Sequence, residues 1–218
     1  MPDFDVQAKI EWLMKTMGYW SYLPIWFVIF AESGLFFGFF LPGDSLLLTT
    51  GFLCYANPGI WNIAVMCFGS FVAAVLGDNV GYYTGRKYGR GLFEKEDSIV
   101  FKKKYLIAAQ DFYDKKGPLA VVAARFVAIV RTFAPIVAGA AAMKYKTFMT
   151  YNLLGGFLWA VGLNLLGYFA GEALEKAVGK GNVEKYLILI TLCVILLSFI
   201  PSAIHIMQEM KKNKSEKD

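Results

Sequence analysis

Four charged residues lie in stretches of the chain that are otherwise apolar enough to enter a lipid bilayer. Two are carboxylates, Glu32 and Asp44, and two are guanidiniums, Arg125 and Arg131. A charged side chain at the centre of a transmembrane helix costs about 2.5 to 3.5 kcal/mol on insertion scales, so such residues are rare and mark pathways for ions or substrates. The four charges therefore indicate a membrane transport protein.

The two arginines favour a lipid phosphate as their ligand. Arginine stays charged when partly buried, and its planar fork matches the geometry of phosphate. Arg125 and Arg131 are six residues apart and would point about 240° apart on one straight helix, so a bend must bring them to one ligand. The alternative is that they form structural ion pairs with Glu32 and Asp44, and both arrangements can alternate within one transport cycle.

The two carboxylates are candidates for proton coupling. Carboxylates in low-dielectric surroundings are protonated more readily than in water. We therefore expect Glu32 and Asp44 to bind protons and to compete with a lipid phosphate for the arginines, which would couple translocation to the proton gradient. Asp44 has a second interpretation, because Gly43, Asp44 and Ser45 could cap a helix that begins at residue 45.

Further polar residues have less distinctive roles. Three are candidates for a cytoplasmic gate or for contact with lipid headgroups: Asp78, Asn79 and Arg86. Arg86, at the end of an apolar stretch, is equally a topology anchor. On a later apolar stretch, three residues are expected to serve in packing and interhelical hydrogen bonds: Asn152, Trp159 and Asn164.

Composition supports a membrane protein and excludes several other classes. Hydrophobic residues make up 57% of the 218 residues and aromatic residues 17%, more than a soluble domain of this size usually buries. The net charge of +5 lies mostly in loops and the tail, which indicates membrane topology and not nucleic-acid binding. Cys54, Cys67 and Cys193 lack metal-ligand spacing, and no Walker-type glycine loop is present, so we expect no metal or cofactor.

The chain reads as an all-α integral membrane protein with four spanning helices. The spans are expected at residues 19–33, 60–84, 147–171 and 186–207. Three segments are expected outside the bilayer: an amphipathic interfacial helix at 1–18, a cytoplasmic loop at 86–117 and a basic cytoplasmic tail at 209–218. Residues 173–208 should form an outer loop and the last span. Lysines and arginines in the loop and tail place both termini in the cytoplasm.

Two further apolar stretches are broken near their middle, at about 34–57 and 118–143. The breaks are expected at Pro42 and Gly43 in the first stretch, and at Pro135 and Gly139 in the second. Arms of about ten residues are too short to cross about 30 Å of hydrocarbon. We predict two opposed re-entrant hairpins, the first entering from the outer side and the second from the cytoplasm.

A weak internal repeat supports opposed hairpins. Glu32 precedes Pro42 by ten residues. Arg125 precedes Pro135 by the same ten residues, at an offset of 93. Each half then continues into a Gly-x-x-x-Gly spacing, at residues 85–89 and 167–171. Related halves with broken helices are typical of inverted-repeat transporters, while the alternative is an ordinary bundle of kinked helices.

Three stretches together closely resemble the bacterial DedA family across residues 19–172: FAESGLFFGFFLPGDSLL (30–47), GDNVGYYTGRKYG (77–89) and FYDKKGPLAVVAARFVAIVRTFAPIVAGAAAMKYKTFMTYNLLGGFLW (112–159). This resemblance implies a transport core of the VTT-domain type with opposed re-entrant hairpins. Family members are implicated in returning undecaprenyl phosphate across the bacterial inner membrane, in phospholipid translocation, in proton-dependent envelope homeostasis and in resistance to cationic antimicrobials. The family's essential acidic pair matches Glu32 and Asp44, and its essential arginines match Arg125 and Arg131.

We therefore expect a proton-coupled lipid transporter of the bacterial inner membrane, not an enzyme, with membrane lipids and protons as its partners. One alternative is a proton-coupled antiporter of small cations or drugs. Another is an intramembrane lipid phosphatase, although no nucleophile beside a base, paired histidine or metal cluster is evident. The sequence leaves open which lipid moves, whether movement is coupled or passive, and whether the protein is a monomer or a homodimer.

Overall fold

The computed structural model describes residues 18–34, 42–94, 117 and 119–179, and all regular elements within these ranges are helical. They are a 3-10 turn at Gly18–Ser21, α2 (Tyr22–Gly34), α3 (Gly43–Ala56), α4 (Ile63–Glu94), α6 (Leu119–Ala124), α7 (Ala128–Ala140), α8 (Tyr145–Gly156), the π-helix η3 (Phe157–Val161) and α9 (Gly162–Val178). The predicted interfacial helix, most of the cytoplasmic loop, the last span and the tail lie outside the described residues.

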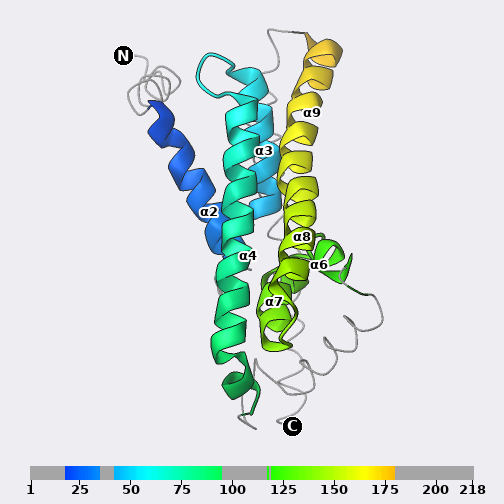
Figure 1. The fold of residues 1–218 in the computed structure, drawn as a ribbon. Coiled ribbons are helices and arrows are strands. Elements are labelled where there is room, and N and C mark those ends of the chain that lie inside the picture. Colours follow the sequence, from blue (N-terminus) through cyan, green and yellow to red (C-terminus); the bar gives the residue numbers. More distant parts are fainter. Residues whose placement is uncertain (1–17, 35–41, 95–116, 118, 180–218) are drawn as a thin grey trace, which may run out of the picture.

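Two long helices form the scaffold of the described part (Figure 1). Residues Ile63–Gly89 of α4, and Tyr145–Ala177 running through α8, η3 and α9, are both long and apolar enough to cross a membrane. At about 1.5 Å per residue, each exceeds the roughly 30 Å hydrocarbon core. These helices correspond to the spans predicted at 60–84 and 147–171.

The first long helix extends further than the sequence analysis predicted. Residues 86–94 were assigned to the cytoplasmic loop, but α4 remains helical to Glu94. Gly85, just before this segment, lies against Ile136 of α7, and Gly89 within it lies against Ala140. Packing against a neighbouring helix stabilises helical structure more than local sequence preference does, which explains why α4 continues into a polar stretch.

A pair of short helices, α2 and α3, lies beside α4. Figure 1 shows α2 running from one end of the molecule to its middle and α3 returning to the same end. The thirteen residues of α2 measure about 20 Å and follow directly on the 3-10 turn Gly18–Ser21, and the full span expected at 19–33 stays a prediction. In the described structure α2 is one arm of the first helix pair. Pro42 and Gly43 stand at the start of α3, as the predicted break requires.

A second short pair, α6 and α7, approaches the middle from the opposite end (Figure 1). The predicted break at Pro135 and Gly139 is wrong, because both residues lie inside α7. The chain instead leaves helical geometry between α6 and α7, at residues 125–127. Proline normally disrupts a helix interior, but tight packing compensates here: a Cβ on Gly81 of α4 would lie 3.2 Å from the Pro135 ring. Gly139 serves as another close contact with α4, at Tyr82.

The second arm of each pair packs on the long helix of the other half. The helix α3 packs mainly along α9, and α7 packs mainly along α4. Glycines lie at both contacts, since Gly167 faces the Leu48 backbone and Gly85 faces the Ile136 backbone. A Cβ at either glycine would overlap the facing carbonyl. The two predicted Gly-x-x-x-Gly spacings therefore have the same use in both halves.

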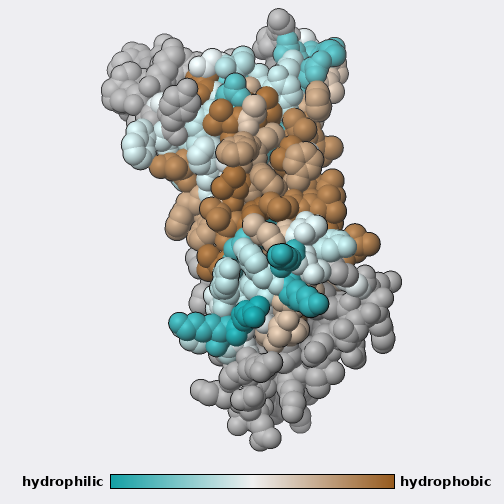
Figure 2. Space-filling model, in the orientation of Figure 1, coloured by the Kyte–Doolittle hydropathy of each residue, from teal (hydrophilic) through white to brown (hydrophobic). Residues whose placement is uncertain are grey.

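The outer surface of the long helices is apolar. Figure 2 shows a band of hydrophobic residues across the middle of the visible face, with hydrophilic residues above and below it. Large hydrophobic side chains exposed on the long helices include Phe68, Leu76, Phe157, Leu166 and Phe169. A contiguous apolar band of this kind is suited to lipid and unsuited to water. The described part of the chain is thus an all-α protein with a membrane-facing surface.

Candidate functional site

Three of the four charges singled out by sequence meet where the two short pairs approach each other. Arg131, in the first turns of α7, is 3% exposed and donates from Nη1 to Asp44 Oδ1 at 2.7 Å. Its Nη2 donates to Oε1 of Glu32, in the last turn of α2. One guanidinium from the second half therefore holds the two carboxylates that flank the break of the first half.

The local backbone explains why these carboxylates can converge. A Cβ on Gly43 would overlap the Glu32 carboxylate, so glycine at this first position of α3 leaves the space that the carboxylate occupies. The capping role considered for Asp44 is wrong, because α3 begins at Gly43 with Pro42 as its N-cap residue and no side-chain cap hydrogen bond. Asp44 instead directs its carboxylate toward Arg131.

Arg125 has a different set of partners. It lies in the break between α6 and α7, and only 1% of its surface is exposed. Its Nη2 donates to Asp78 Oδ2 at 2.5 Å and to Asn152 Oδ1 at 2.6 Å. Nε and Nη1 have no hydrogen-bond partner within the described residues. The alternative raised by the sequence, ion pairs of the arginines with Glu32 and Asp44, is present for Arg131, whereas Arg125 pairs with Asp78.

Trp159 lies between the two arginine groups. Its indole Nε1 donates to Asp44 Oδ1 at 2.6 Å, which is the same oxygen that accepts from Arg131. The guanidinium carbon of Arg131 lies 4.5 Å from the ring centroid of Trp159, and that of Arg125 lies 5.8 Å away. Both distances are within the range of cation–π attraction. The sequence predicted packing and interhelical hydrogen bonds for Trp159, and the bond to Asp44 is such an interhelical hydrogen bond; the contact with both guanidiniums was not predicted.

The π-helix η3 sets the register of the long helix that carries Trp159 (α8, η3 and α9). Asn152 and Asn164 are twelve residues apart, and an unbroken α-helix would rotate them about 120° from each other. The extra residue in a π-turn removes about 100° of that rotation. Both asparagines thereby face the interior, where Asn152 meets Arg125 and Asn164 accepts a hydrogen bond from Thr50 Oγ1 at 3.0 Å. π-turns of this kind are frequent at functional sites.

The three residues considered for a gate do not form one cluster. Asp78 lies at the middle of α4, buried against Arg125, and not at a water-facing end. Asn79 donates to the Val75 carbonyl at 2.7 Å and accepts from the Tyr145 hydroxyl at 3.0 Å. Arg86 is exposed and donates to the Tyr82 hydroxyl at 2.9 Å.

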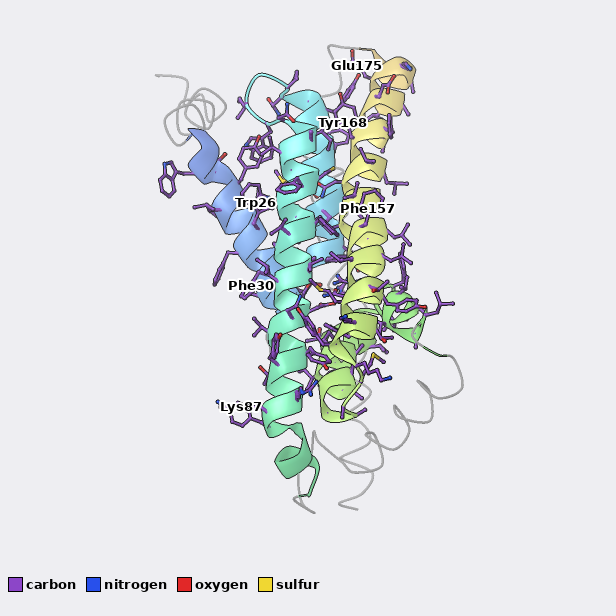
Figure 3. All side chains as sticks on the ribbon, in the orientation of Figure 1. Trp26, Phe30, Lys87, Phe157, Tyr168 and Glu175 are labelled. Carbon is purple, nitrogen blue, oxygen red and sulfur yellow. The ribbon has the colours of Figure 1, made fainter. Side chains whose placement is uncertain are left out.

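The ends of the described bundle differ in charge. Figure 3 shows Lys87, which follows Arg86, at one end of the bundle and Glu175 at the other.

The whole site is a polar layer of three carboxylates and two guanidiniums joined by one indole, and all of its members except the half-exposed Asp44 are buried. Its members are Glu32, Asp44, Asp78, Arg125, Arg131 and Trp159. Buried ion pairs recover the cost of desolvation only partly, so such a layer is weak evidence for stability alone. Chemically, an anion can replace a carboxylate on either arginine, and a freed carboxylate can accept a proton.

Comparison with known proteins identifies the family. A model of the VTT domain matches residues 41–169, more than half of the chain. Protein DedA of Escherichia coli K12 is 37% identical over 206 residues, which cover 94% of this chain and 91% of that relative. The chain belongs to the DedA family. The matched domain contains all residues of the polar layer except Glu32.

Other relatives of this DedA-family chain are also membrane proteins. One from Mycobacterium tuberculosis is 38% identical over 202 residues, covering 92% of this chain and 86% of the relative. Another, from Mycobacterium leprae, is 39% identical over 177 residues, covering 81% and 75%. No solved structure gives a significant match. Together with the two apolar spans, these relatives establish a membrane location.

Proposed function

We propose that this DedA-family protein is a lipid transporter of the bacterial inner membrane that moves undecaprenyl phosphate, or a related phospholipid, between the two leaflets. The observation that carries the proposal is the pair of buried arginines, Arg131 held by two carboxylates and Arg125 by one. The planar fork of a guanidinium matches the geometry of a phosphate, which many membrane lipids carry in their headgroup.

The arrangement of the short pairs supports access from both leaflets. In this proposal, α2 with α3 and α6 with α7 enter the bilayer from opposite sides as re-entrant hairpins. Broken helices that meet near the bilayer midplane are a feature of inverted-repeat transporters. Irregular backbone at such depth is tolerated where protein or a water-filled cavity surrounds it. A headgroup could then reach the polar layer from one side and leave to the other.

The unequal exposure of the two carboxylates suggests an order of events. The Asp44 side chain is 51% exposed, while that of Glu32 is 1% exposed. An arriving phosphate would first replace Asp44 on Arg131 and then compete with Glu32. A buried carboxylate that has lost its cationic partner favours the protonated form. Proton uptake by the displaced acids, and proton release when the lipid leaves, would couple transport to the proton gradient.

This mechanism requires no chemical change in the lipid, so we propose a carrier and not an enzyme. Within the described residues, the side chains hydrogen-bonded to the two arginines are two aspartates, one glutamate and one asparagine. Hydrolysis of a lipid phosphate would need a positioned nucleophile beside a base. Carboxylates already held by guanidiniums suit a role as exchangeable counter-ions.

The test is lipid movement in proteoliposomes, with and without an inward proton gradient. Native protein would be compared with Arg131→Ala and Glu32→Gln, and Lys176→Ala would serve as the control. Lys176 forms an exposed ion pair with Glu172, away from the polar layer. We expect undecaprenyl phosphate to move faster with the gradient in native and control proteins, and both site variants to lose this movement.

Other outcomes would change the assignment. Equal movement of undecaprenyl phosphate and a labelled phospholipid, whatever the gradient, would mean a scramblase. Release of inorganic phosphate would indicate a phosphatase. Movement of neither lipid would reject lipid transport, and proton-driven uptake of a cationic dye would then support the antiporter.

A further inference from the structure

We propose that Trp159 is a positioning residue that couples the two arginines, so that an anion bound at Arg131 changes the anion affinity of Arg125 and the reverse. This inference rests on the proposed function, because the anion is the lipid phosphate. It gives Trp159, an uncharged residue that forms no ion pair, a role in substrate binding.

Two donors share one carboxylate oxygen of Asp44. Arg131 and Trp159 both donate to Asp44 Oδ1, at 2.7 and 2.6 Å. A phosphate that takes Arg131 from Asp44 leaves this carboxylate bonded to the indole. Trp159 therefore holds Asp44 in place during the exchange, ready to recover Arg131 when the phosphate leaves.

The indole ring of Trp159 contacts both guanidiniums. The Trp159 ring lies within cation–π range of Arg131 and of Arg125. Because the ring is fully buried, any shift of one guanidinium toward a ligand must be accommodated through the ring or its neighbours. The Trp159 ring is therefore a packing contact shared by the two arginine groups, and it lies beside the direct electrostatic interaction between the two guanidiniums.

The helix around Trp159 is irregular. Trp159 lies at the centre of the π-helix η3, where the hydrogen-bond pattern departs from that of an α-helix. Gly155 and Gly156 precede this turn, and a Cβ on Gly155 would lie 3.0 Å from Cδ of Arg125. Trp159 thus lies in the part of the long helix that can most readily change register, and this part is next to Arg125.

One test uses Trp159 as its own reporter. In the full-length chain, Trp12, Trp20, Trp26 and Trp61 are replaced by phenylalanine, which leaves Trp159 as the single tryptophan. The protein in detergent micelles is titrated with undecaprenyl phosphate and, separately, with undecaprenol. We expect a saturable change in tryptophan emission with the phosphate and none with the alcohol. Binding of labelled undecaprenyl phosphate without any emission change would overturn the inference.

A second test measures the coupling itself. Affinity for undecaprenyl phosphate is measured for Arg125→Lys, Arg131→Lys and the double variant, in the native chain and in Trp159→Phe. In the native chain, we expect the double variant to deviate about fivefold or more from the product of the single effects. In Trp159→Phe, the effects should multiply within about twofold. A merely structural tryptophan would lower affinity or yield without changing this deviation.

The matched control is Trp61→Phe. Trp61 is also a buried tryptophan whose indole donates a hydrogen bond, to Ser21 Oγ at 3.2 Å, but it lies outside the polar layer. If Trp159→Phe retained the same non-additivity as Trp61→Phe, the coupling role would be rejected. If the native protein bound and moved undecaprenyl phosphate in that case, the proposed function would stand. If the native protein bound no undecaprenyl phosphate, both would fail.

Discussion

At the scale of single residues, the two arginines differ in how they are held. Arg131 binds two carboxylates, one of which is half exposed, and Trp159 covers its face. Arg125 is enclosed, binds Asp78 and Asn152, and keeps two guanidinium nitrogens without a partner in the described structure. Arg131 is therefore the better placed for first contact with a ligand, and Arg125 is the more dependent on a single carboxylate.

This dependence predicts a large stability loss for Asp78→Asn. Removing one member of a buried ion pair leaves the other charge desolvated, which costs about 3 to 5 kcal/mol. Thermal unfolding in detergent should show a clear fall in midpoint. The exposed pair offers the control, and Glu172→Gln should change the midpoint little. Equal midpoints for the two variants would contradict a structural ion pair at Arg125.

The Arg131 group predicts a different ranking. Glu32→Gln should destabilise the protein more than Asp44→Asn, because the Glu32 side chain is buried and the Asp44 side chain is half exposed. The amide introduced by Asp44→Asn would still offer an oxygen to the Trp159 indole. The same unfolding measurement decides the order, and a larger loss for Asp44→Asn would show that the half-exposed pair is the stronger one.

At the scale of helices, the sequence anticipated the breaks and spans unevenly. The helix start at Pro42-Gly43 is marked by a proline and a glycine, and the two long spans are marked by continuous hydrophobic sequence. The sequence located the helix start and both spans correctly. The break at residues 125–127 was missed because it contains neither proline nor glycine, while Pro135 remains helical through contacts with α4. The partnership of Arg125 with Asp78 was missed for a related reason: it depends on which helices become neighbours, which no local pattern encodes.

Helix contacts also predict a position-specific effect of added methyl groups. Gly167→Ala would drive a Cβ into the Leu48 backbone and separate α3 from α9, at a cost of about 1 to 3 kcal/mol. Gly162→Ala, five residues earlier on the same helix, meets no atom within 4 Å. It should be neutral or stabilising, since alanine favours helix by about 0.5 to 1 kcal/mol over glycine. If Gly167→Ala and Gly162→Ala lowered the unfolding midpoint equally, the close contact between Gly167 and Leu48 would be contradicted.

At the scale of the whole molecule, the two halves are related by packing and not by one constant spacing. Gly85 faces Ile136 as Gly167 faces Leu48, yet the two glycines are 82 residues apart and their partners are 88 apart. The offset of 93 found in the sequence therefore describes neither contact. An insertion or deletion between the arms shifts such offsets without changing the crosswise packing. Corresponding contacts are thus a better guide to the repeat than matched prolines.

The crosswise arrangement predicts that its two ends face opposite sides of the membrane. Lys87 lies at the end where α4 finishes and Glu175 at the other end (Figure 3). Exposed Arg86 adjoins Lys87, and exposed Lys144 and Lys146 flank Tyr145, whose ring packs on Tyr82 and Tyr83 of α4. Basic residues favour the cytoplasmic side. In a chain with its native cysteines replaced, Lys144→Cys should react with an impermeant thiol reagent only from the cytoplasm.

Gly59 lies in the exposed turn before α4, at the opposite end of the bundle from Lys144. A cysteine introduced by Gly59→Cys should therefore react with the same reagent only from outside. Inverted labelling of both positions would reverse the orientation and keep the opposed entry of the short pairs. Labelling of both from one side would place the two ends in the same compartment, and the polar layer could then not exchange a phosphate between leaflets. Accessibility at these two positions therefore tests the geometric premise on which any leaflet-to-leaflet transport depends.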